Sequence, residues 1–179
     1  MERAEDGREE WGGEGEGKSG EGKRSGGQDN GREKERQKEK NNSKKQGELA
    51  EMMFMVKAAR MGFAVAKPYG DSEAYDFIVD VRRGLWRVQV RSSTSLQYGS
   101  YGVNLQRHAN GQLIPYDASE IDFLVAYVMP CEAWFVIPVE AIAGRSTAKL
   151  CLKKNPRSGK LGKYWEAWGL MNWRWPANG

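Results

Sequence analysis

The sequence is poor in histidine and cysteine, and it has no long apolar run. His108 is the single histidine, which excludes any catalytic site built from two or more histidines, and we interpret it as a surface loop residue. Cys131 and Cys151 form no CxxC pair, so we expect two small buried side chains in a reducing, cytoplasmic protein rather than a zinc site. The longest apolar run, Phe123–Met129, is far below the roughly 20 residues of a membrane span. We therefore expect no membrane partner, and the N-terminus lacks the apolar stretch of a signal peptide.

The first quarter of the chain is also almost devoid of apolar side chains. Residues 1–47 hold 12 acidic and 12 basic residues and many glycines. Such a segment cannot bury enough surface to offset chain entropy, so residues 1–45 are predicted to be a disordered, charged, low-complexity tail. The remainder carries the whole net charge of +4 and is long enough for one domain, over residues 46–179. This charge is compatible with a polyanionic partner but does not require one.

A phosphate-binding motif in this tail is interpreted as a coincidence. Residues 12–19 satisfy the pattern GxxxxGK[ST], and residues 15–20 satisfy GxGxxG. Both motifs need a strand before the loop and a helix after it, because the helix N-terminus and fixed backbone amides hold the phosphate. Trp11 is the only apolar residue close before the motif, and nothing periodic follows the motif.

The rest of the chain predicts an α/β domain. A helix is expected over Glu48–Met61, with a core-facing stripe at helical spacing and Gly62 as its end. That stripe consists of Leu49, Met52, Met53, Val56 and Ala59. Strands are expected over Phe63–Lys67, Tyr75–Val81, Leu85–Arg91, Tyr101–Gln106, Phe123–Met129 and Ala133–Pro138. A polar loop is expected over Ser92–Ser100, a turn at Asn110–Gly111, one helical turn over Val139–Ala143 and a short helix near Tyr164–Leu170. This order predicts a mixed β-sheet flanked by helices.

Polar residues interrupt the apolar strands of the expected hairpin over residues 75–91. Side chains alternate between the faces of a strand, so Gln89 and Arg91 share a face. A two-residue turn centred on Arg82 and Arg83 places Asp76 opposite Gln89, whereas a turn one residue later places Asp76 opposite Arg91. Either register puts all three polar residues on one face. A three-residue loop without a bulge would separate Asp76 from the other two.

These residues and their surroundings resemble the PD-(D/E)XK nucleases, and most closely the group I intron-associated homing endonuclease branch. The resemblance covers roughly residues 46–142 and rests on several short sequence segments. These are Gly47–Glu51, Gly62–Phe63, Lys67–Asp71, Tyr75–Asp80, Arg87–Ser92, Ile121–Tyr127 and Trp134–Ile142. It implies a restriction-endonuclease-like fold and hydrolysis of phosphodiester bonds in double-stranded DNA with Mg²⁺. It also implies a homo-oligomer, dimer or tetramer, and cutting both strands of a duplex is hard for a monomer.

The resemblance also implies the site. Asp76 matches the metal-binding aspartate, and Gln89 matches a position where this branch carries glutamine instead of an acid. Glu51 matches the helix glutamate that supports the metal, with Glu48 one turn away as a weaker candidate. The carbonyl oxygen of Val90 completes a set of oxygen ligands that suits Mg²⁺. Without the resemblance, Asp76 would be interpreted as a strand cap or as the ion-pair partner of Arg91.

Arg91 departs from the family pattern, which has lysine at this position. Arginine stays protonated, so it cannot serve as a base, although it can bind phosphate through two hydrogen bonds. Activity is therefore expected to be weakened, with Lys67 as a substitute lysine; the alternative is a catalytically degenerate DNA-binding protein that keeps the fold. Basic residues are candidate phosphate contacts or simply a solvated surface. They are Arg82, Arg83, Lys153, Lys154, Arg157, Lys160 and Lys163. Four C-terminal tryptophans, Trp165, Trp168, Trp173 and Trp175, are expected to pack the last helix.

Overall fold

The computed structural model describes residues 26–70, 72–82, 84–151, 157 and 159–172. The chain divides into two compact units, Met1–Lys38 and Glu39–Gly179. The described part of the first unit is helical, and its described side chains are exposed. The second unit holds every strand of the described residues and the candidate site. The phosphate-binding motif of residues 12–20 lies outside the described residues.

The helix α1 (Gly26–Arg60) starts much earlier than the expected helix, which began at Glu48. Its N-terminal part is rich in Lys, Glu, Gln and Arg, which have high helix propensity. An i,i+4 pair at 4.0 Å between Lys44 and Glu48 adds to that tendency. The disorder expected for residues 1–45 stays a prediction for residues 1–25, which lie outside the described residues. At the other end, Gly62 follows α1 with a φ of 79° and donates its N–H to the carbonyl of Ala59.

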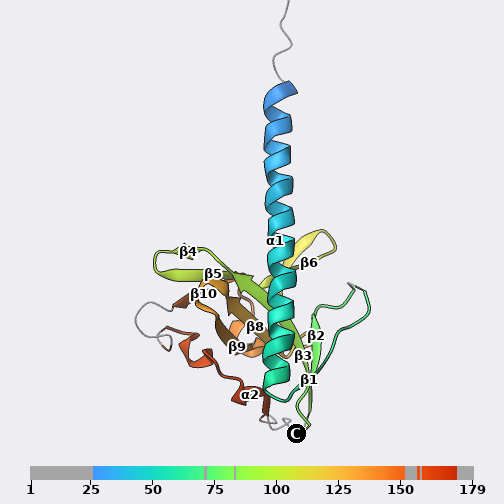
Figure 1. Ribbon diagram of the computed structural model, residues 1–179, viewed down its shortest axis with the longest axis vertical. Helices are drawn as coiled ribbons and strands as arrows, with labels where there is room; N and C mark the ends of the chain where they lie inside the picture. The colour runs from blue at the N-terminus through green and yellow to red at the C-terminus, as the bar shows by residue number, and fades with distance from the viewer. Residues whose placement is uncertain (1–25, 71, 83, 152–156, 158, 173–179) are drawn as a thin grey trace, which may run out of the picture. The chain divides into compact units, whose positions relative to one another are not determined.

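A five-stranded mixed sheet forms the centre of the second unit. Its strands are β1 (Ala64–Ala66), β2 (Phe77–Asp80), β3 (Leu85–Ser93), β8 (Phe123–Val128) and β9 (Ala133–Pro138), in the order β1-β2-β3-β8-β9. All neighbours are antiparallel except β3 and β8, which are parallel. The sequence predicts each of these five strands. The expected fold class, an α/β domain with a mixed sheet, is confirmed (Figure 1).

The hairpin of β2 and β3 has the first of the two registers considered. Phe77 pairs with Val88 and Asp80 with Leu85, which places Asp76 opposite Gln89. The turn closes with the N–H of Val81 donating to the carbonyl of Gly84 at 3.1 Å. Alternation then puts Phe77 and Val88 on the face toward α1, and the polar residues on the other face.

The second face of the sheet is covered by strands that the sequence only partly indicated. A small sheet has the order β10-β5-β4, and a separate hairpin joins β6 and β7. These strands are β4 (Leu96–Gln97), β5 (Ser100–Asn104), β6 (Gln106–Ala109), β7 (Gln112–Pro115) and β10 (Thr147–Cys151). The expected turn at Asn110–Gly111 is present, with φ values of 50° and 76°. The expected loop Ser92–Ser100 is wrong, because β3 continues to Ser93 and β4 follows, and β10 was not expected at all.

Short helical turns complete the described chain. They are η1 (Met129–Cys131), η2 (Val139–Ile142), η3 (Gly162–Tyr164) and α2 (Gly169–Asn172). The single turn expected over Val139–Ala143 is confirmed, but the helix expected near Tyr164–Leu170 is replaced by η3 and α2. Cys131 is exposed, contrary to expectation, because it lies in the tight connection between β8 and β9. Among the described residues, no helix is long and apolar enough to cross a membrane.

The face that α1 buries differs from the expected one. Ala50, Phe54 and Ala58 are buried, whereas Met52 and Val56 are 52% and 53% exposed. The two alanines let the helix approach the sheet closely, and the Phe54 ring stacks on Phe77 at 5.1 Å. Trp168 packs in the same cluster and is buried, as expected for a tryptophan near the C-terminus. Trp173 and Trp175 lie outside the described residues.

Candidate active site

Asp76 and Gln89 meet at the open end of the β2–β3 hairpin. The backbone N–H of Asp76 donates to the carbonyl of Val88 at 2.9 Å, so the pairing of the two strands continues one residue beyond β2. This places the Asp76 carboxylate where Oδ2 accepts hydrogen bonds from Gln89 Nε2 at 2.7 Å and from the Val90 N–H at 2.8 Å. The two side chains therefore lie on the same side of the sheet, as the hairpin register predicted.

The Gln89 amide lies between two oxygen atoms. Its Nε2 donates to Asp76 Oδ2 and also to the carbonyl oxygen of Val90, at 3.2 Å. The Gln89 residue is 5% exposed, so these hydrogen bonds satisfy a polar group that would be costly to bury alone. A carboxylate oxygen and a main-chain carbonyl oxygen thus already face one shared donor.

The pKa of Asp76 is raised from 3.8 to about 6. Burial is the largest cause, because it disfavours the charged carboxylate, and the nearby Glu51 carboxylate raises the pKa further. The hydrogen bond from the Val90 N–H, the Arg91 charge and the Gln89 amide act in the opposite direction. A carboxyl group that titrates close to neutral pH in a hollow of the surface is a common property of functional sites.

Glu51 reaches the same region from α1 and forms an ion pair with Lys67. Lys67 Nζ lies 2.6 Å from Glu51 Oε2, and the Glu51 side chain is 23% exposed. Lys67 directly follows β1, and its ammonium lies 5.8 Å above the centre of the Phe77 ring. Glu48, the weaker candidate, is more exposed and faces Lys44. Of the two helix glutamates, Glu51 is thus the one held at the site.

Arg91 is held by residues that the sequence did not single out. Its Nη2 donates to the hydroxyl of Tyr116 and, at 3.4 Å, to the carbonyl of Gln106. The guanidinium carbon lies 5.5 Å from the centre of the Tyr116 ring. Burial raises the pKa of Tyr116, and the Arg91 charge opposes that rise. Within the described residues Arg91 forms no ion pair with Asp76. The structure therefore does not contain the structural Asp76–Arg91 ion pair that was the alternative interpretation.

Three adjoining hollows in the surface share Arg91 in their lining. One of about 240 Å³ is lined by Asp76 and Gln89, one of about 370 Å³ by Glu51 and Val90, and one of about 560 Å³ by Glu51 and Lys67. Arg91 therefore connects the hairpin side of the site to the helix side. An open, polar region of this kind suits part of a large polar substrate better than an enclosed small molecule.

Comparison with known proteins identifies the family. A sequence model of the family described as PD-(D/E)XK endonuclease matches residues 41–171. This chain belongs to the PD-(D/E)XK endonuclease family. It is also similar to a solved structure, that of the bacterial homing endonuclease I-Ssp6803I, with a TM-score of 0.65 and 35% sequence identity. The similarity covers 73% of this chain and 93% of that chain, and no curated protein matches this one. The family and the branch that the sequence resembled are confirmed.

The PD-(D/E)XK domain also contains site residues that sequence reasoning missed. Arg107 and His108 of β6, together with Tyr116 after β7, line the hollow of Asp76 and Arg91. His108 is exposed, as expected, but it lies in β6 rather than in a loop, and it lines this hollow. These residues reach the site through the fold of the β6–β7 hairpin, and no local motif marked them.

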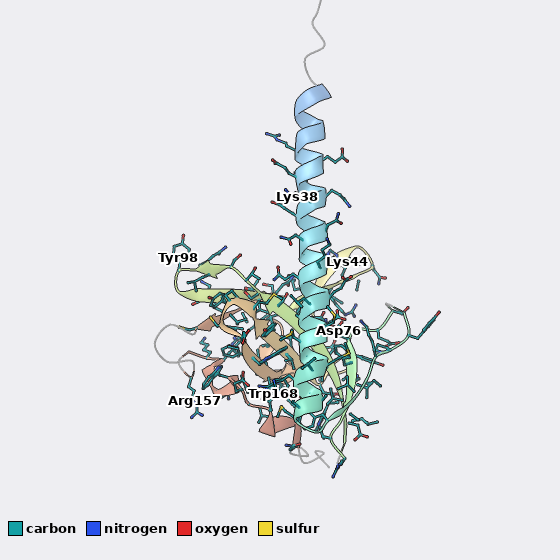
Figure 2. The ribbon with its side chains drawn as sticks, in the orientation of Figure 1. Lys38, Lys44, Asp76, Tyr98, Arg157 and Trp168 are labelled. Atoms are coloured by element: carbon teal, nitrogen blue, oxygen red, sulfur yellow. The ribbon has the colours of Figure 1, made fainter. Side chains whose placement is uncertain are left out.

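Of the basic residues proposed as DNA contacts, the four that the structure describes line none of the three hollows; these are Arg82, Arg157, Lys160 and Lys163. Arg82 lies at the tip of the β2–β3 hairpin, about 20 Å along the strand from Asp76. Arg157 and Lys160 are exposed, and Arg157 projects from a different side of the domain than Asp76 (Figure 2). Arg83, Lys153 and Lys154 lie outside the described residues. Their contact with DNA stays a prediction.

Proposed function

We propose that this protein is a metal-dependent endonuclease that hydrolyses phosphodiester bonds in double-stranded DNA. The observation that carries the proposal is the meeting of the Asp76 carboxylate, the Gln89 amide and the Val90 carbonyl beside Arg91. Membership of the PD-(D/E)XK endonuclease family and similarity to a homing endonuclease support it. The working form that we propose is a homo-oligomer, because two copies of the site can then act on the two strands of a duplex.

The oxygen atoms at the site fit Mg²⁺. The described residues contain no group of three or more His, Cys, Asp and Glu side chains that could hold an ion. Among these residues there is therefore neither a metal site with soft ligands nor one made of carboxylates alone. Asp76 and the carbonyl of Val90 already share one donor, and they are hard oxygen ligands of the kind Mg²⁺ prefers. Gln89 would add its amide oxygen by giving up its hydrogen bonds from Nε2, and Glu51 would support the ion from the helix. When bound, the ion supplies charge stabilisation at a phosphate oxygen and acidifies a water molecule.

The protein's own residues orient the substrate. Arg91 is fixed by Tyr116 and remains protonated, so it binds a phosphate oxygen and stabilises charge that develops on it. In the reaction a water oxygen bonds to phosphorus and one ester oxygen leaves. The water releases a proton to the solvent, and the leaving oxygen takes a proton from the solvent. No side chain needs to change its covalent state.

A second candidate, a DNA-binding protein that no longer cleaves, is favoured by one observation. The Arg91 guanidinium is tied to Tyr116 and Gln106, and an arginine cannot take up the proton that a lysine at this position could accept. The two candidates differ in whether the native chain cleaves DNA at all.

A plasmid-nicking assay with Mg²⁺ separates them. The native chain, Asp76→Ala and Arg91→Lys are compared, with EDTA as the metal-free control. We expect cleavage by the native chain that disappears in Asp76→Ala and in EDTA. Cleavage by Arg91→Lys alone, or DNA binding without cleavage by any variant, supports the non-cleaving protein. Absence of DNA binding contradicts both.

A further inference from the structure

Lys67, which the sequence offered as a substitute for the family lysine, lies at the site, and the proposed function above gives it no role. It follows β1 directly, and its ammonium pairs with Glu51 at 2.6 Å. The same ammonium lies 5.8 Å from the centre of the Phe77 ring. Lys67 also lines the hollow of about 560 Å³ together with Glu51 and Arg91. A flexible lysine at the wall of this hollow is therefore held by a charged contact and by an aromatic one.

The distribution of charge at the site indicates a role for Lys67. Phosphodiester hydrolysis concentrates negative charge on the phosphate oxygens, while Glu51 and Asp76 contribute two carboxylates close by. The Arg91 guanidinium is directed toward Tyr116 and Gln106, on the side of the β6–β7 hairpin. On the helix side Lys67 is paired with Glu51, whereas Lys44, which lines the same hollow, lies 4.0 Å from Glu48. An ammonium on a four-carbon stem can turn among several acceptors, unlike the fixed plane of a guanidinium.

We infer that Lys67 is a catalytic residue of this site, whose ammonium contacts a substrate phosphate oxygen next to Glu51 and stabilises the charge that develops there. The inference rests on the proposed function. The inferred role is electrostatic, and no proton passes through Lys67. A residue that merely holds Glu51 in place would be a positioning residue, and the experiment distinguishes the two roles.

The experiment compares Lys67→Met and Lys67→Arg with the native full-length chain. Lys57→Met is the matched control, because Lys57 is also an ion-paired lysine, 3.0 Å from Glu166, but lines none of the three hollows. Single-turnover cleavage of a DNA duplex with Mg²⁺ is one measurement. The other is duplex binding in EDTA over a range of salt concentrations, which reports phosphate contacts without any metal. Thermal unfolding verifies that each variant folds, and Lys67→Gln replaces Lys67→Met if the latter does not.

We expect Lys67→Met to lower the cleavage rate by about 10²- to 10³-fold, as for loss of one charge-stabilising donor. The slope of log K against log salt should fall by about one, as for loss of one phosphate contact, and Lys67→Arg should keep the native slope. Lys57→Met should match the native chain in both measurements. An unchanged slope in Lys67→Met overturns the phosphate contact and leaves a positioning role, and an unchanged cleavage rate overturns the inference altogether. A native chain that never cleaves contradicts the proposed function, and the catalytic role of Lys67 then falls with it.

Discussion

The raised pKa of Asp76 predicts that the ionised carboxylate destabilises the fold in the absence of metal. The pKa rises from 3.8 to about 6, so the folded protein binds this proton more tightly than the unfolded chain does. The stabilising effect of the proton is complete below pH 3.8 and is lost as the pH rises to about 6. Above that pH the charge costs about 3 kcal/mol, an upper value because the side chain is not fully buried.

Asp76→Asn removes this charge and keeps an oxygen that can accept the hydrogen bond from the Val90 N–H. In EDTA we expect Asp76→Asn to raise the free energy of unfolding by up to about 3 kcal/mol at pH 8, and by about 1 kcal/mol at pH 4.5. Urea denaturation at the two pH values measures the difference. Asp122→Asn is the control, and we expect it to lower the free energy of unfolding. Asp122 accepts hydrogen bonds from the Arg87 side chain at 3.0 Å and from the Arg87 backbone N–H at 2.7 Å.

Adding Mg²⁺ gives the same prediction a second readout. At about 100 times its Kd, a ligand that binds only the folded state adds about 2.7 kcal/mol of stability. The native chain should gain this amount at pH 8, whereas Asp76→Asn should gain much less because it has lost the charged ligand. A difference between native chain and Asp76→Asn that does not change with pH, or a less stable Asp76→Asn at pH 8, would refute the reasoning.

Two further predictions concern the supports of the site. Phe54→Ala should lower the free energy of unfolding, measured by urea denaturation, by about 3–5 kcal/mol, because loss of the fully buried ring leaves a cavity against Phe77. Met55→Ala, on the exposed side of α1, is its control and should change that free energy by no more than about 0.5 kcal/mol. Tyr116→Phe should slow single-turnover cleavage by about 10- to 100-fold through misplacement of Arg91, with the DNA affinity nearly unchanged. The fully exposed Tyr69→Phe is its control, and an unaltered rate in Tyr116→Phe would show that Arg91 needs no such support.

The shared face of Asp76 and Gln89 could be predicted from sequence because two local rules agree. Alternation decides which residues of a strand share a face, and a two-residue turn leaves only two pairings, both of which bring these side chains to the same side of the sheet. The expected buried face of α1 was wrong for a physical reason. The segment has two overlapping apolar faces, one with Met52 and Val56 and one with Phe54, and only the bulk of the aromatic cluster on the sheet decides between them.

The support of Arg91 could not be predicted from sequence. Tyr116 lies 25 residues further along the chain, and it reaches Arg91 only because the β6–β7 hairpin folds back toward β3. Contacts of this kind depend on loop geometry that has no periodic signal. The ion pair of Lys67 with Glu51 could not be predicted either. The two residues meet through the packing of α1 on the sheet, and no spacing in the sequence indicates this contact.

Phe77 links the interior of the protein to its chemistry. One side of its ring packs on Phe54 of the long helix, and the Lys67 ammonium lies over it. A substitution that merely shrinks this ring would loosen the helix and release the lysine together. One aromatic side chain thus contacts both the helix that covers the sheet and a lysine at the wall of the site.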